Sequence, residues 1–197
     1  MGAMTWVLLA VGLLAVFWAV GAYNRLVRLK NAIANAFGQI DVQLKRRYDL
    51  IPNLVEVARK YLAHEAQTLE AVIAARNQAR SAEQTAAGSP LNAGALGALA
   101  GAEQMLGGAL GRLFAVAEAY PDLKADQTMR ELSEELSSTE NRIGFARQAY
   151  NDHVLEFNDA AAQFPTLIVA RLFNFQTQAM LESTTSEAER APVKVTF

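Results

Sequence analysis

Three glutamates are the residues of this sequence whose type and spacing could do chemistry together. If the chain folds as antiparallel helices, Glu65, Glu103 and Glu140 fall near the apolar stripes of successive helices, about 22–26 Å from one end of the bundle by helical rise. Three carboxylates at one level repel one another unless they pair with cations or bind a metal ion. The arginines in reach are Arg76, Arg142 and Arg147. We expect arginine pairing or solvent contact, and we keep a divalent cation site as the alternative, although no histidine supports it at this level.

Other catalytic chemistry finds little support in the sequence. The chain has 197 residues with no cysteine and two histidines, which excludes thiol nucleophiles, disulfide scaffolds and cysteine-ligated metals. Tyr61 and Tyr150 stand three residues before His64 and His153, so the Glu-x-x-His pattern of di-iron bundles is absent. Phosphate-loop, nucleophile-elbow and His-Glu-x-x-His motifs are also missing. We therefore expect a non-enzymatic protein with no cofactor.

The charge balance bears on the class of partner. Lys plus Arg is 18 and Asp plus Glu is 20, so the net charge is −2. A nucleic-acid-binding protein needs a basic face to hold phosphates, so no nucleic acid is expected as a partner. Hydrophobic residues make up 52% of the chain, and they are concentrated at the N-terminus.

The first 23 residues are expected to form a transmembrane anchor. No charged residue precedes Arg25, and the apolar run from Trp6 to Ala22 would rise about 25 Å as a helix. A cleaved signal peptide is the alternative, but it requires a positive segment before the apolar run. Here the cations follow the run, which predicts an N-terminus outside and residues 24–197 in the cytoplasm. The residues expected to contact lipid in this segment are Trp6, Phe17, Trp18 and Tyr23.

Beyond the anchor, helical spacing of apolar residues predicts an all-α fold without strands. We expect the anchor helix to continue to about Arg47 and a second helix to begin at Asp49, with Pro52 in its first turn. A Gly/Ala-rich loop at about 81–98, a third helix at 99–120 and a fourth at 129–157 would complete an up-down-up-down four-helix bundle. The expected boundaries are 1–23 for the anchor, 24–160 for the bundle, 161–176 for a membrane-proximal segment and 177–197 for a flexible tail.

This topology predicts a charged turn at the end of the bundle far from the membrane. The turn would consist of Lys45, Arg46, Arg47, Tyr48 and Asp49. The charges suit the ends of the two adjoining helices, where cations and anions complement the helix dipoles. Helix capping is therefore the favoured role of these charges. Because apolar side chains accompany them, a partner-docking surface is the alternative, and these five residues are its predicted partner-binding residues.

The membrane-proximal segment is too short to span a bilayer but suits an interfacial helix. Leu167, Ile168, Leu172 and Phe175 share one helical face, and Arg171 could extend towards lipid headgroups. We expect these four apolar residues to contact the membrane.

Several motifs resemble the LemA family. They are Tyr23-Asn24, the run Ile40–Val55, His64-Glu65, Tyr120–Ala125, Glu140–Ile143, Ala146-Arg147-x-x-Tyr150-Asn151 and Phe164-Pro165. The resemblance implies a bacterial inner-membrane protein with one N-terminal helix and a cytoplasmic helical bundle, and it supplies no enzyme activity. It also implies kinship with a branch, in magnetotactic bacteria, associated with forming intracellular membrane compartments.

Three functions are compatible with these features. We expect a membrane-tethered scaffold or adaptor, with membrane lipid and an unidentified cytoplasmic or membrane protein as partners. One alternative is a membrane-shaping protein that assembles into homo-oligomers. A metal-dependent enzyme in the bundle core is the least favoured, given the missing motifs.

Overall fold

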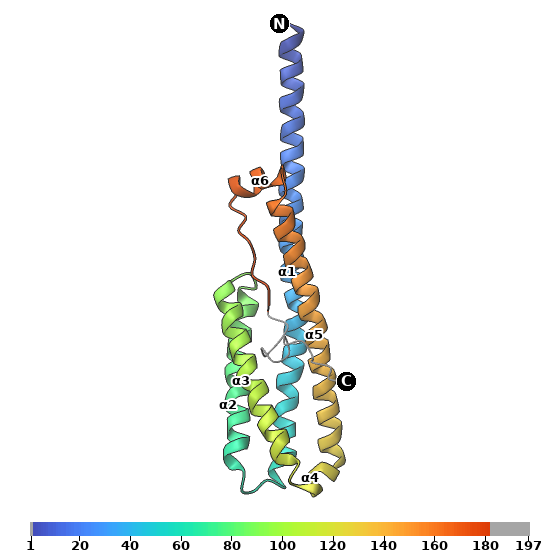
Figure 1. Cartoon of the computed structure of the whole chain (residues 1–197), viewed down its shortest axis with the longest axis vertical. Helices are drawn as coiled ribbons and strands as arrows, with labels where there is room; N and C mark the ends of the chain where they lie inside the picture. The colour runs from blue at the N-terminus through green and yellow to red at the C-terminus, as the bar shows by residue number, and fades with distance from the viewer. Residues whose placement is uncertain (1, 182–197) are drawn as a thin grey trace, which may run out of the picture.

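The computed structural model describes residues 2–181, and the regular secondary structure of this part of the chain is helical, without strands. Figure 1 shows a slender bundle from which one long helix projects far beyond the others. This confirms the expected all-α antiparallel architecture, in which a long N-terminal apolar helix packs against later helices. Residues 182–197 of the expected tail lie outside the described residues.

The longest element is α1, an uninterrupted helix over Ala3–Arg59, which corresponds to about 85 Å of helical rise. An 18-residue window of α1 has a mean hydropathy of 2.1 with 6% of the window buried, which makes α1 the one described helix long and apolar enough to cross a membrane. Continuous burial against other helices begins near Ala22 and includes Leu26, Ile33 and Phe37. One helix therefore combines an exposed apolar N-terminal segment, residues 3–21, with a longer packed part.

The expected helix break between Arg47 and Asp49 is wrong. Pro52 lies inside α1, where its missing N–H leaves the carbonyl oxygen of Tyr48 without an intrahelical partner. Arg76 Nε of α2 donates a hydrogen bond to this oxygen at 3.0 Å. The turn follows at residues 60–65 instead, and α2 covers Ala66–Gly88.

The expected loop at 81–98 is also wrong, because only residues 89–92 separate α2 from α3, which covers Ala93–Ala117. Ala79 and Ala86 of α2 and Leu96 of α3 are buried, so packing makes these Ala- and Gly-rich ends helical. Asn92 caps α3, its side chain accepting a hydrogen bond from the Ala95 N–H at 3.0 Å.

The short α4, Pro121–Ala125, leads into α5, Gln127–Ala162. Asp126 caps α5 by accepting a hydrogen bond from the Met129 N–H at 2.9 Å, and it also accepts one from the Tyr61 hydroxyl at 2.9 Å. The end of the bundle far from the projecting helix is thus built from residues 60–65 and 118–126.

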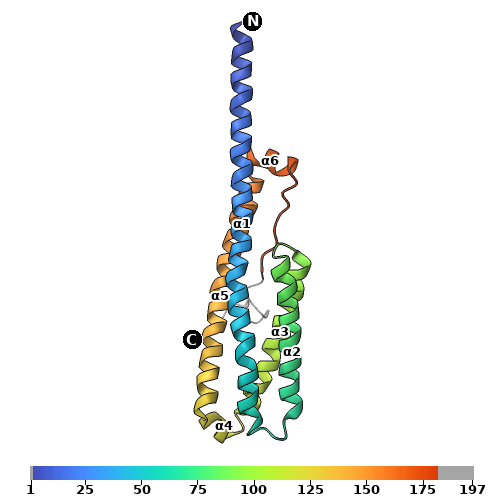
Figure 2. The ribbon, with the colours of Figure 1, turned by 180° about the vertical axis from the view of Figure 1, so that it is seen from behind.

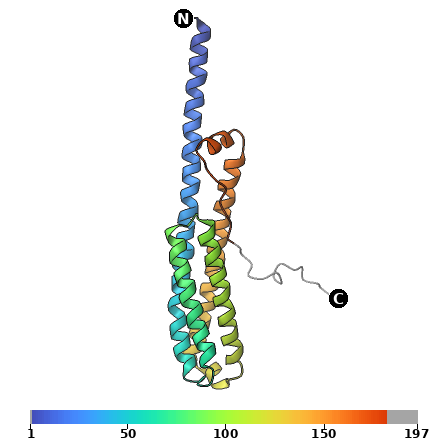
Figure 3. The same cartoon turned by 90° about the vertical axis from the view of Figure 1, so that its left-hand side faces the viewer.

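The helices pair unevenly around the core. α1 packs along α5 and also on α2, while α2 packs on α3. α3 and α5 form no comparable interface, although they lie on the same side of α1 in Figure 3. The upper part of α5 extends past the ends of α2 and α3 and accompanies α1 alone (Figure 3). The bundle therefore contains all four long helices, α1, α2, α3 and α5, only in its lower part.

After α5 the chain crosses α1 and then turns back down. The short α6, Thr166–Leu172, lies across the bundle axis beside α1, as Figures 1 and 2 show. The Phe173 ring packs on the Tyr23 ring with centroids 4.8 Å apart. Asn174, with φ 54°, adopts the left-handed conformation that asparagine tolerates, and the chain reverses there. Residues 174–181 then descend in extended form, and we call them the strap.

Candidate functional site

A charge cluster joins α1, α3 and α5, with a buried centre and the half-exposed Glu140 at its edge. At its centre is Glu103, which is 4% exposed. Arg47 Nη1 lies 2.7 Å from Glu103 Oε2, and the Tyr48 hydroxyl donates a hydrogen bond to Oε1 at 2.5 Å. Arg47 Nη1 also lies 3.2 Å from Glu140 Oε2, and Arg147 Nη2 lies 3.7 Å from Glu103 Oε2. We call these five residues the Glu103 cluster.

The electrostatics of the Glu103 cluster are balanced, with two cations facing two anions. Burial, and then the adjacent Glu103 carboxylate, raise the pKa of the Tyr48 hydroxyl, which remains a neutral donor. Arg47 is 5% exposed, and its Nε is buried without a hydrogen-bond partner among the described residues. The cluster thus ties three helices together through mutual pairing.

The three predicted glutamates are only partly brought together. Glu103 pairs with Arg147 as expected and with Arg47, which was not foreseen because Arg47 was assigned to a turn. Glu140 also pairs with Arg47, whereas Glu65 lies at the N-terminus of α2 near the far end of the bundle. Within residues 2–181, no group of three or more potential metal ligands is arranged to hold an ion.

The predicted partner-binding residues lie in the middle of α1 instead of at a turn, because α1 does not break there. Arg47 and Tyr48 are buried in the Glu103 cluster and are therefore not surface residues. Asp49 is exposed. The other two are exposed and paired, Lys45 with Asp41 at 2.6 Å and Arg46 with Glu135.

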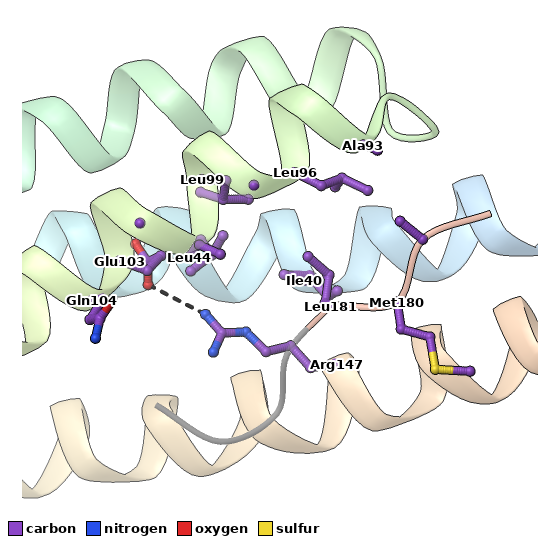
Figure 4. Close-up of a pocket in the computed structure, with 14 residues that line it drawn as sticks. Ile40, Leu44, Ala93, Leu96, Leu99, Glu103, Gln104, Arg147, Met180 and Leu181 are labelled. Carbon is purple, nitrogen blue, oxygen red and sulfur yellow. Dashed lines mark ion pairs between the residues drawn. The ribbon is translucent and has the colours of Figure 1, made fainter. Parts of the chain in front are cut away.

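Two cavities follow one another between α3 and α5 and form one groove, which we call the α3–α5 groove. The upper cavity has a volume of about 440 Å³ and the lower about 570 Å³, and Glu103, Gln104 and Arg147 line both. Figure 4 shows the upper cavity, with Arg147 reaching from α5 towards Glu103 and the end of the strap beside Ile40. Sequence reasoning missed this groove, since it expected a closed bundle.

The walls of the lower cavity carry small residues from both helices. On α3 a Cβ added at Gly107, Gly108 or Gly111 would meet nothing within 4 Å, and Ser133 and Ser137 line the α5 side. Larger apolar residues complete the lining, namely Leu110, Phe114 and Leu136. Open space between small residues allows the backbone of another segment to approach closely.

Two asparagines of α5 hold the strap at the upper end of the groove, where its last residues, Ala179, Met180 and Leu181, line the upper cavity. Asn158 donates to the Gln178 carbonyl at 3.0 Å and accepts from its N–H at 2.9 Å. Asn151 donates to the Leu181 carbonyl at 2.7 Å and accepts from its N–H at 2.8 Å. Seven helical residues rise about 10.5 Å and three extended residues about 10 Å, so the two spacings match. The asparagine spacing is the one sequence signal that could have indicated this contact.

A buried carboxylate, Glu83, lies between α1 and α2. Glu83 is 1% exposed, and both its carboxylate oxygens lack hydrogen-bond partners among the described residues. Lys45 Nζ lies 3.8 Å from Glu83 Oε1. Burial, and then the adjacent Asp41 carboxylate, raise the pKa of Glu83 to about 7.

The predicted membrane-contacting residues fall into two groups. In the N-terminal part of α1, Trp6, Phe17, Trp18 and Tyr23 are exposed. At α6 the expected face is shifted: Ile168 and Leu172 are exposed, Leu167 is half-buried, and Phe175 packs between Tyr23 and Phe157 with ring centroids 5.6 and 6.2 Å away.

The family of the chain follows from its sequence match. The LemA family model matches residues 36–197, which include the Glu103 cluster and the two asparagines that bind the strap, Asn151 and Asn158. The chain belongs to the LemA family. It is 29% identical over 177 residues to Protein LemA of Metamycoplasma hominis, covering 90% of this chain and 75% of that protein.

Magnetosome proteins are also among the relatives of this LemA-family chain. It is 27% identical over 169 residues to magnetosome protein MamQ of Magnetospirillum gryphiswaldense, covering 78% of this chain and 62% of that protein. Magnetosome protein MamQ 2 of Paramagnetospirillum magneticum is 26% identical over 172 residues, with the same coverage. The chain thus spans less than two thirds of the length of these magnetosome relatives.

Proposed function

We propose that this LemA-family protein is a membrane-anchored scaffold whose α3–α5 groove binds a segment of a partner protein at the cytoplasmic face of the bacterial inner membrane. The observation that carries the proposal is that α5 already holds a segment of its own chain, the strap, at the upper end of the groove, while the lower cavity leaves about 570 Å³ between α3 and α5. A surface that already binds polypeptide backbone is suited to bind more of it.

The anchor is supported by the exposed apolar N-terminal segment of α1, residues 3–21. Its side chains have no protein to pack against in the described structure, so a bilayer would be their apolar surroundings. Arg25, Arg28 and Lys30 follow directly, and this charge favours a cytoplasmic bundle with the N-terminus outside.

The lower cavity supports docking of a peptide segment. Its apolar lining from Leu110, Phe114 and Leu136 offers contacts for side chains, while the glycines and serines allow close backbone approach. The Glu103 cluster forms part of the same lining and supplies polar partners at one end.

Membrane shaping through self-assembly is the second candidate. Two observations favour it: relatives named magnetosome proteins, and exposed apolar residues at α6 beside the span. In that case a second copy of the chain would occupy the groove.

A photo-crosslinking amino acid placed at Ser137 or Gly108 in the full chain tests the proposal in native membranes. We expect both positions to crosslink to the same distinct protein, while the exposed Gln84 on α2 serves as the control position. Crosslinks to a second copy would favour self-assembly instead. Equal crosslinking from Gln84, or none from the groove, would contradict docking there.

The orientation is tested separately with a reporter fused after Phe197. A cytoplasmic signal is expected from the basic residues that follow the span. A periplasmic signal would contradict the proposed localisation without affecting the groove.

A further inference from the structure

We infer that α6 is a second membrane-contacting element, which lays Phe164, Ile168, Leu172 and Phe173 into the cytoplasmic leaflet beside the α1 span. The inference rests on the proposed membrane anchoring through α1. It adds a lipid-binding face that belongs to the bundle, and with it a fixed height and tilt of the bundle above the bilayer.

The position of α6 along α1 is the first argument. Of the described side chains from Ala3 to Gly21, Ala19 alone is partly buried, and full burial starts at Ala22. Tyr23, the next residue, contacts the Phe173 ring at the end of α6. In Figures 1 and 2, α6 lies across the bundle axis at this level, below the projecting apolar part of α1. The helix therefore lies where the bilayer surface must be if α1 spans the membrane.

The exposed face of α6 is the second argument. Ile168 and Leu172 lie four residues apart in α6, so they share one face, and they are 57% and 77% exposed. Phe164, just before the helix, is 80% exposed. Phe173 adds a ring that is 54% exposed. Val169 and Ala170 on the other side are buried, and α6 contacts both α1 and α5. A contiguous exposed apolar stripe on a docked helix marks an interaction surface.

The surrounding charge indicates that this surface meets anionic lipid. Arg171 lies in α6, and Arg25, Arg28 and Lys30 follow within about two turns of Tyr23 on α1. All four are exposed, and the ion pairs found within residues 2–181 involve none of them. Apolar side chains flanked by cations are the pattern of interfacial helices, where the cations contact lipid phosphates.

The exposed face of α6 differs from the apolar face that helical periodicity predicts for this segment. Leu167 turns partly towards the protein, and Phe175 packs on Tyr23 and Phe157. Phe164 and Phe173 take their places on the exposed side. Phe164 and Phe173 lie just outside the two ends of α6, so helical periodicity does not set their direction. The turn before α6 and the chain reversal at Asn174 place them on the exposed side.

Site-directed spin labelling of the full chain in lipid nanodiscs with anionic phosphatidylglycerol tests the inference. The chain has no cysteine, so single cysteines can be introduced at Leu172, with Ile168 as a second position. Leu13→Cys reports the span, and Phe145→Cys is the matched control, because Phe145 is an apolar residue 73% exposed on α5 within the bundle. The measurement compares collision of each label with oxygen, which partitions into lipid, and with a water-soluble nickel complex.

We expect labels at Leu172 and Ile168 to resemble Leu13, with high oxygen and low nickel accessibility, and Phe145 to show the reverse. If Leu13 reports lipid but Leu172 and Ile168 resemble Phe145, the inference is overturned and the anchor stands. Low accessibility to both reagents at Leu172 would also overturn it, because protein would then cover the face. A water-exposed label at Leu13 would overturn the anchor itself.

Discussion

Arg76 of α2 donates a hydrogen bond from its Nε to the Tyr48 carbonyl oxygen of α1, at 3.0 Å, and so supplies a bond that the backbone of α1 lacks. This oxygen is the one that residue 52 would bond in a regular helix, and residue 52 is proline. Arg76 thus compensates the cost of Pro52 and at the same time ties α2 to α1. The contact allows α1 to continue where the sequence suggests a break.

Arg76→Ala should destabilise the protein by about 1–3 kcal/mol, because it leaves the Tyr48 carbonyl without its donor. The same substitution in a Pro52→Ala background should cost clearly less, since the backbone N–H gained at this position can then bond that carbonyl. Denaturant unfolding of the four proteins in detergent micelles gives the coupling energy. Arg80→Ala, an exposed position on the same helix, is the control. Equal costs of Arg76→Ala in both backgrounds would show that the hydrogen bond does not substitute for the helical one.

Arg47 and its neighbour Arg46 should respond very differently to the same substitution. Arg47→Met leaves Glu103 buried with one cation fewer and should cost about 3–5 kcal/mol. Arg46→Met removes an exposed pair with Glu135 and should cost at most about 1 kcal/mol. The double variant Arg47→Met with Glu103→Leu should recover much of the loss, because the remaining interior is then apolar. Unfolding midpoints of the three variants check this, and similar losses at both arginines would disprove it.

Glu83 should make stability fall as pH rises from about 4.5 to 7. Its pKa is raised to about 7 in the folded protein, so the folded state binds more protons than the unfolded state in this window, and ionisation favours unfolding. The loss amounts to about 1.4 kcal/mol for each unit by which the pKa is raised. Melting temperatures of wild type and Glu83→Gln between pH 4.5 and 8 measure it. The slope should flatten in Glu83→Gln and persist in Glu70→Gln, which changes an exposed residue of α2.

Asn151→Ala should release the end of the strap without unfolding the bundle. The substitution removes both hydrogen bonds to Leu181, one donated and one accepted. Hydrogen exchange followed by mass spectrometry should show at least tenfold faster exchange in the peptide containing Leu181, while peptides of α1 stay protected. Asn141→Ala, at an exposed position of the same helix, should change neither. Unchanged exchange at Leu181 in Asn151→Ala would show that packing of its side chain alone holds the strap.

The sequence alone determined the features that depend on local composition. An uncharged apolar run followed by cations predicts a spanning segment, because the bilayer responds to hydropathy and charge and not to packing. Helical periodicity predicted the all-α bundle, because the spacing of apolar residues along the chain records which face of each helix is buried. The family resemblance was likewise visible in runs such as Ile40–Val55.

Tertiary structure decided where the helices end and which residues meet. In the sequence, Pro52 indicates a helix start. In the structure it lies within α1, because Arg76, 24 residues further on, supplies the missing hydrogen-bond donor. The composition of the Gly/Ala-rich segment at about 81–98 predicts a loop, whereas burial of Ala86 and Leu96 in the folded protein favours helix. Because α1 continues to Arg59, Arg47 moves from a predicted surface turn to the core beside Glu103. The α3–α5 groove has the same cause, because the helix boundaries set which helix faces oppose one another. No local sequence pattern predicts a gap between two helices that do not pack together.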